Sequence, residues 1–174
     1  QLTFTGGGEL DNGLTVGISF VIDQGDDTAA STGPFDSHSV SVSSDTLGKI
    51  TLTGEGGGNA AGALDTTAAG DIWDNFDGTT TGANVDGSSA NADTIVWALP
   101  AMVDGLAVNA SYSPQQAVAA ASTAWAMTYT GVEGLTVSYG QGDASTGVST
   151  TEADATSMSA SYAYGPVTVA YSNH

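Results

Sequence analysis

Three aspartates and two large aromatic residues lie close together in a tract that otherwise consists mostly of small, neutral residues. The stretch "AAGDIWDNFDG" (68–78) contains Asp71, Asp74, Asp77, Trp73 and Phe76, and Asp65 lies shortly before it. Carboxylates at this density attract cations, and they are the hard oxygen ligands that calcium prefers. What this stretch can do depends on the elements that hold it in place.

The whole chain shares this acidic character. Its 174 residues carry a formal charge of −18, with 19 acidic residues and Lys49 as the single basic residue. This charge argues strongly against binding to nucleic acid or to an anionic bilayer surface, and it makes cations the natural partners. The length fits one domain. The absence of cysteine excludes disulfides and thiolate metal sites.

Apolar residues recur at every second position along most of the chain, which is the period of β-strands. One predicted strand, for example, has on one face Leu14, Val16, Ile18, Phe20 and Ile22. The same pattern recurs in nine further segments, around 2–4, 40–42, 50–52, 95–99, 106–112, 125–129, 135–139, 158–164 and 167–171. The sequence therefore predicts an all-β protein of ten strands.

Tight turns and long connections alternate between these strands. The tight turns, each with a glycine where a positive φ is needed, are "LDNGL" (10–14), "SDTLGK" (44–49), "VDGL" (103–106), "VEGL" (132–135) and "YGPV" (164–167). The long connections are 24–37, 56–92, 113–122 and 141–156. In an antiparallel meander, alternate connections emerge at the same end of the sheet. We therefore expect a loop end, which holds the long connections, and a turn end, which holds the tight turns.

The polar face of these strands distinguishes a membrane barrel from a soluble sheet. Soluble sheets usually carry charged residues at solvent-facing positions, whereas these strands carry Ser, Thr, Gly, Ala and Asn. Small neutral groups suit a wet, confined lumen, and the apolar face then meets lipid. Aromatic residues are predicted at the loop ends of strands and near their turn ends, which is typical of membrane girdles. Those at the loop ends are Tyr112, Trp125, Tyr139 and Tyr171, and those near the turn ends are Tyr129 and Tyr164. The pattern favours a transmembrane β-barrel over the alternative, a secreted acidic soluble β-sheet surface or adhesin module.

The sequence resembles the general porins of Gram-negative bacteria, and most closely the alphaproteobacterial type. The resemblance rests on "GGELDNGLTVGISFVID", "SVSVSSDTLGKITLTGEG" and the "GLTVSY"-like repeats after the turns, and it covers nearly the whole chain. It implies an outer-membrane channel through which small hydrophilic solutes and ions diffuse passively. It also implies a homotrimer surrounded by outer-membrane lipid.

The predicted strand directions place both ends of the chain at the loop end. Bacterial outer-membrane barrels have an even number of strands, and their termini customarily lie on the side of the short turns. We therefore expect residues 1–174 to form a single partial β-barrel domain. It would lack about one strand before Gln1 and several after His174, in a whole of about 16 strands.

In porins a long third loop folds into the pore and narrows it, and the resemblance assigns this position to residues 56–92. In this inward-folding constriction loop, carboxylates facing the lumen would favour cations, and aromatic side chains would anchor the loop to the wall. The predicted pore residues are Asp65, Asp71, Asp74 and Asp77, with Trp73 and Phe76 as anchors. A solvated surface loop is the competing interpretation. General porins also set arginines opposite this loop, but the sequence contains none, so no wall residue is assigned.

Metal and enzyme sites are only weakly indicated. Two acidic stretches, "DQGDD" (23–27) and "DIWDNFD" (71–77), lack the ligand spacing of a calcium-binding hand. They make Asp26, Asp27, Asp71 and Asp74 candidates for calcium, with solvated carboxylates as the simpler interpretation and no other cofactor expected. His38 and His174 have no partner histidine at ligand spacing. Nucleophile and phosphate-binding motifs are absent, so the sequence predicts a protein that is not an enzyme.

Overall fold

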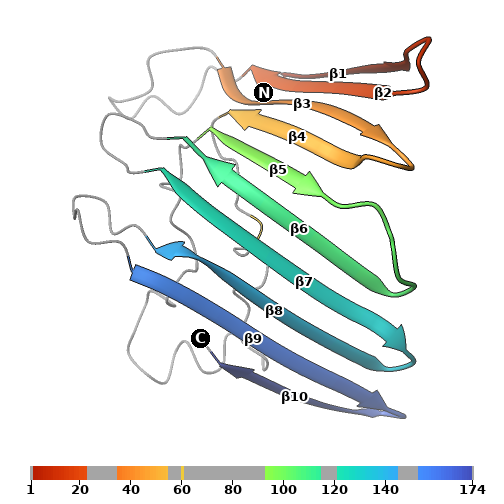
Figure 1. The fold of residues 1–174 in the computed structure, drawn as a ribbon, viewed down its shortest axis with the longest axis vertical. Helices are drawn as coiled ribbons and strands as arrows, with labels where there is room; N and C mark the ends of the chain where they lie inside the picture. Colours follow the sequence, from red (N-terminus) through yellow and green to blue (C-terminus); the bar gives the residue numbers. More distant parts are fainter. Residues whose placement is uncertain are drawn as a thin grey trace.

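The computed structural model describes residues 2–22, 35–54, 60, 93–114, 121–144 and 153–173. These residues form one antiparallel sheet of ten strands, each paired with its neighbour in the chain (Figure 1). The strands are β1 (Leu2–Glu9), β2 (Thr15–Ile22), β3 (Phe35–Ser44), β4 (Gly48–Gly54), β5 (Thr94–Ala98), β6 (Leu106–Ser113), β7 (Ser122–Val132), β8 (Leu135–Ala144), β9 (Ala153–Tyr164) and β10 (Val167–Asn173). The predicted all-β meander of ten strands is confirmed. Within the described ranges, no helix is long and apolar enough to cross a membrane.

The five tight turns lie together at one end of the sheet, and β1 begins and β10 ends at the other (Figure 1). Each predicted turn glycine has a positive φ, from 59° at Gly165 to 80° at Gly13. At Gly105 the carbonyl oxygen accepts a hydrogen bond from the Thr130 amide at 2.7 Å, which ties the turn to β7. A Cβ at this position would collide with the backbone of Gly131. Glycine is therefore required here by both conformation and space.

The strands reach further toward the loop end than the sequence pattern predicts. Residues 141–156 were expected to be a loop, but β8 continues to Ala144 and β9 begins at Ala153, with Asp143 opposite Asp154. These flanking residues are polar or small and show no apolar alternation, so periodicity does not reveal them. Pairing with the neighbouring strand keeps them extended, because backbone hydrogen bonds do not depend on side-chain hydrophobicity.

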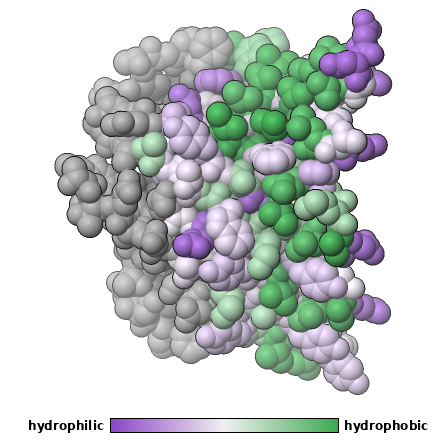
Figure 2. Space-filling model, viewed as in Figure 1, coloured by the Kyte–Doolittle hydropathy of each residue, from purple (hydrophilic) through white to green (hydrophobic). Residues whose placement is uncertain are grey.

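The register of the strands gives the sheet two faces with opposite chemistry. One row of directly opposed residues runs Ile18, Val40, Leu52, Ile95 and Tyr112 across β2 to β6, and we call this side the apolar face. The neighbouring row runs Gly17, Ser41, Thr51, Val96, Ser111, Ala124 and Gly142 across β2 to β8, and we call this side the polar face. Figure 2 shows the apolar face as a hydrophobic band that crosses the strands, with hydrophilic residues at the turn end. The predicted alternation of faces is confirmed.

Burial in this sheet is the reverse of that in a soluble protein. Among the described residues, the buried hydrophobic ones are all alanines, namely Ala60, Ala124 and Ala126. Large apolar residues are exposed instead, such as Ile18 at 47% and Val169 at 67%. The buried polar residues are Thr94, Ser111, Ser113, Ser122, Ser138 and Ser157. An apolar exposed surface of this extent is unsuited to water and suits contact with lipid.

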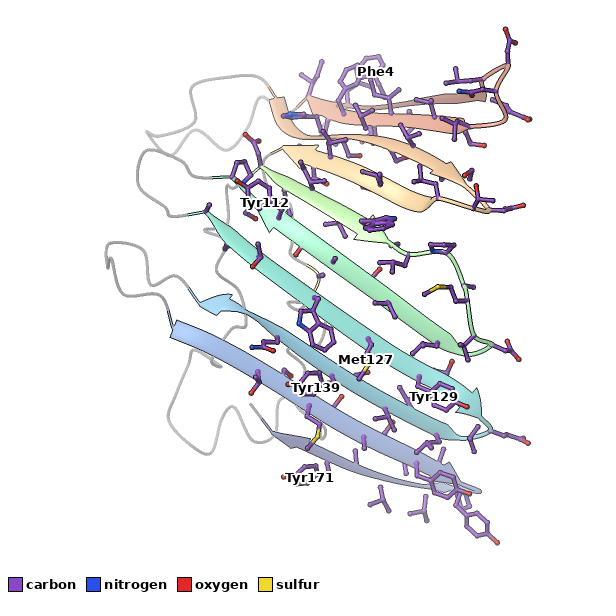
Figure 3. All side chains as sticks on the ribbon, in the orientation of Figure 1. Phe4, Tyr112, Met127, Tyr129, Tyr139 and Tyr171 are labelled. Atoms are coloured by element: carbon purple, nitrogen blue, oxygen red, sulfur yellow. The ribbon has the colours of Figure 1, made fainter. Side chains whose placement is uncertain are left out.

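The aromatic side chains of the apolar face lie part-way along the strands as well as near their ends. Figure 3 shows Tyr112 toward the loop end of β6 and Tyr129 near the turn end of β7, as predicted. Tyr139, in contrast, lies opposite Met127 in the interior of β8, and its ring centroid is 5.4 Å from that of Trp125. The expectation that Trp125 and Tyr139 end their strands is wrong, because both strands continue past them with polar residues. On tilted strands, side chains at one membrane depth occupy different positions along successive strands.

Candidate functional site

The polar face is a wall of small hydroxyl-bearing and aliphatic residues. Its hydroxyl groups form hydrogen bonds between neighbouring strands, with Thr94 Oγ1 3.3 Å from Ser113 Oγ and Thr128 Oγ1 3.1 Å from Ser138 Oγ. A hydroxyl group can both donate and accept, so such a wall can exchange hydrogen bonds with water and with polar solutes. The wall therefore offers hydrogen bonding with little fixed charge.

One residue of the long 56–92 segment is described, and it lies against this wall. The Ala60 amide donates a hydrogen bond to Ser111 Oγ on β6 at 2.9 Å, and Ala60 is 6% exposed. Ser111 Oγ in turn is 3.4 Å from the Ala124 carbonyl oxygen on β7, where it can donate. The chain thus meets the polar face at Ala60, shortly after β4 ends.

The wall around this contact is built from residues without long side chains. Opposite and beside Ser111 the register places Ala124, Gly142 and Ala126, and Gly140 lies opposite Ala126. All of these positions are buried. Their small side chains project little above the backbone of β6 to β8 on the polar face.

Charged residues are concentrated at the turn end. Four of the tight turns carry an exposed acid, namely Asp11, Asp45, Asp104 and Glu133. Lys49, the only basic residue in the chain, lies on the polar face of β4, opposite Ser43 and Ala98. From the sequence Lys49 was not assigned to a face, although its alternation with Ile50 and Leu52 indicates the polar one.

The predicted pore and metal residues lie outside the described residues. These are Asp65, Asp71, Asp74 and Asp77, the anchors Trp73 and Phe76, and the calcium candidates Asp26 and Asp27. Within the described part of the chain, no three His, Cys, Asp or Glu residues come together as metal ligands. His38 lies opposite Phe20 and Gly54, where a Cβ on Gly54 would collide with the imidazole.

Comparison with known proteins agrees with this architecture. A model of the family described as Gram-negative porin matches residues 1–173. A search of curated proteins finds no match. Two solved structures, both mutants of the porin of Rhodobacter blastica, resemble this chain with TM-scores of 0.50 and 0.52 at 15% and 13% sequence identity. The match covers 97% of this chain and 71% of each of those chains.

The sheet, its faces and the family match lead to one assignment. A meander of antiparallel strands with an exposed apolar band and a hydroxyl-rich opposite face is the construction of an outer-membrane barrel. The match to the family model extends over nearly all of the chain. The chain therefore belongs to the Gram-negative porins, the β-barrel channels of the bacterial outer membrane.

Proposed function

We propose that this protein is a passive diffusion channel for small hydrophilic solutes and ions, with a preference for cations and with no enzymatic activity. The observation that carries the proposal is the reversed burial of the sheet. Small polar residues such as Ser138 are buried on one face, whereas large apolar residues such as Val137 are exposed on the other. An apolar face in lipid accounts for the exposed apolar residues, and a water-filled interior accounts for the polar character of the opposite face.

The charge of the chain supports the cation preference. The net charge of −18 arises from 19 acids and one lysine, and acids occupy four of the five tight turns at the turn end. Negative charge around a low-dielectric opening raises the local concentration of cations. We propose that the carboxylates of Asp65, Asp71, Asp74 and Asp77 add to this effect inside the pore.

The contact at Ala60 supports an inward course for the 56–92 segment. A loop that lay on the outer surface would have no reason to bury an amide against Ser111 on the polar face. The small residues of β6 to β8 project little on that same face. We propose that the segment continues inward as a constriction loop, anchored by Trp73 and Phe76.

Replacing Asp71, Asp74 and Asp77 together by asparagine tests the proposal, because this keeps size nearly constant and removes charge. In planar bilayers under a salt gradient, the reversal potential should shift toward lower cation selectivity. Conductance at high salt should change little, because the Debye length falls from about 30 Å at 0.01 M to about 10 Å at 0.1 M.

The matched control replaces three turn acids, Asp11, Asp45 and Asp104, by asparagine. These acids lie at the mouth and are exposed to solvent, so their loss should shift the reversal potential less. An unchanged reversal potential in the Asp71, Asp74 and Asp77 variant would show that these acids do not face the ion path. The segment would then lie on the surface.

A further inference from the structure

We propose that Lys49 is a fixed positive charge on the pore wall near the turn-end mouth, where it opposes the cation preference of the channel. The inference rests on the proposed function in one respect, namely that water fills the space on the polar face. It differs from that proposal because it assigns a specific residue that acts against the overall charge.

The register places Lys49 on the polar face. Lys49 lies opposite Ser43 on β3 and Ala98 on β5, and the same row continues to Thr15 and Asn109. The next residue, Ile50, points to the other side, where it lies opposite Val42 and Trp97. Adjacent residues in a strand have opposite orientations, so Lys49 cannot share the lipid-facing side with Ile50.

The position of Lys49 along β4 places it near the mouth. It directly follows Gly48, the positive-φ residue of the second tight turn, and it is exposed. The turn-end carboxylates of Asp45 and Asp104 lie in the tight turns beyond the strands. Ions that pass between the turn end and the lumen therefore meet first the acidic rim and then Lys49.

The nearest described acid along the chain, Asp45, lies in the tight turn four residues before Lys49 and forms no salt bridge with it. Among the residues that the structure describes, no salt bridge involves Lys49. The acid of its own row is Glu9, which lies three strands away across Thr15 and Ser43. At a strand spacing of about 4.8 Å, this separation is about 14 Å, which exceeds the Debye length of about 8 Å at physiological ionic strength.

A lone wall charge should change the ion selectivity of the pore measurably. Lys49 lowers the local cation concentration and raises that of anions around it. Its replacement by glutamine should increase the ratio of cation to anion permeability by about two-fold at low salt, and the effect should fade as salt screens the charge. Replacement by glutamate should increase that ratio further.

The absence of cysteine from these 174 residues allows a sharper test. Lys49→Cys and its neighbour Ile50→Cys form a matched pair, since they differ in face and hardly in position along the strand. Charged, membrane-impermeant methanethiosulfonates form a disulfide with the thiolate and release methanesulfinate. Labelling of the folded protein, measured by mass, and the reversal potential in planar bilayers are the two readouts.

Labelling should be fast at position 49 and slow at position 50. A trimethylammonium reagent at Lys49→Cys should restore the wild-type reversal potential, and a sulfonate reagent should shift it further toward cations. Faster labelling at position 50, or labelling at 49 without a change in reversal potential, would overturn the proposal. Labelling needs no ion current, so it tests the orientation of Lys49 even if Asp71, Asp74 and Asp77 prove to have no role in selectivity.

Discussion

At the scale of single residues, the surroundings of each side chain on this sheet depend on the parity of its position in the strand. Ser157 on β9 is 1% exposed, whereas Met158 beside it is 44% exposed. In water such an arrangement would be unfavourable, because it withdraws a hydroxyl group from solvent and leaves a large apolar side chain in it. With lipid on the apolar face, the exposed side chain of Met158 has suitable surroundings.

Val108 and Asn109 on β6 provide a test of this parity. Val108 lies opposite Met127 on the apolar face, and Asn109 lies opposite Ala126 on the polar face. Arginine at Val108, if that residue is near the midplane, should destabilise the protein folded in lipid vesicles by about 2–4 kcal/mol, and arginine at Asn109 should destabilise it far less. Urea titration in vesicles measures both values. Equal losses at the two positions would contradict the assignment of the faces.

The strand pattern alone predicts the face of a residue, whereas it says nothing about the position of the candidate pore acids. Alternation around Lys49 is sufficient to place it on the other face of the sheet from Ile50, because a strand has a fixed period of two. Asp71, Asp74 and Asp77 lie in a segment without such a period, so their assignment to the lumen depends on family resemblance and stays a prediction. The hydrogen bond between Ala60 and Ser111 also could not be predicted from the sequence, because it joins two small residues far apart in the chain.

At the scale of the elements, the sequence predicted the positions of the turns more accurately than the positions of the strand ends. All five predicted turn glycines have a positive φ, which few other residues adopt at low cost. The ends of β8 and β9 were missed, because Asp143 and Asp154 pair through their backbones and carry no apolar pattern. Strand lengths in this sheet are set by neighbouring strands, which local periodicity does not report.

Two turn glycines with similar φ differ in the space around them. Gly105 has φ of 73° and no room for a Cβ beside Gly131, whereas Gly13 has φ of 80° and open space. Gly13→Ala should cost about 1–2 kcal/mol through backbone strain alone. Gly105→Ala should cost more, because the backbone must also move away from Gly131. The difference between their unfolding free energies in detergent and urea measures this, and equal costs would show that the turn at Gly105 yields freely.

At the scale of the whole molecule, the acidic composition raises the question of bound calcium. The calcium candidates are Asp26, Asp27, Asp71 and Asp74, and their spacing matches no calcium-binding hand. We expect a chelator to leave the thermal midpoint unchanged at moderate salt, because solvated carboxylates need no specific ion. A drop that calcium reverses and magnesium reverses poorly would instead demonstrate a calcium site, since magnesium demands a tighter octahedral geometry.

The sheet as a whole exposes its apolar face, and this face determines how the protein behaves in detergent. Ile18, Leu52, Trp97 and Val169, for example, are all at least 41% exposed, so the folded protein needs lipid or detergent to cover them. We expect the protein to partition into the outer-membrane fraction and to show heat-modifiable migration on a detergent gel. The strands are held by backbone hydrogen bonds that detergent disrupts slowly without heat.

The unheated sample should also contain a species of three chains, as expected for the homotrimer that the porin resemblance implies. Light scattering in detergent, corrected for bound detergent, gives its mass independently of gel migration. Retention of the heat-modifiable shift with a one-chain mass would refute the trimer and leave the barrel intact. Partition into the soluble fraction, with identical migration before and after heating, would instead contradict the membrane location of the apolar face.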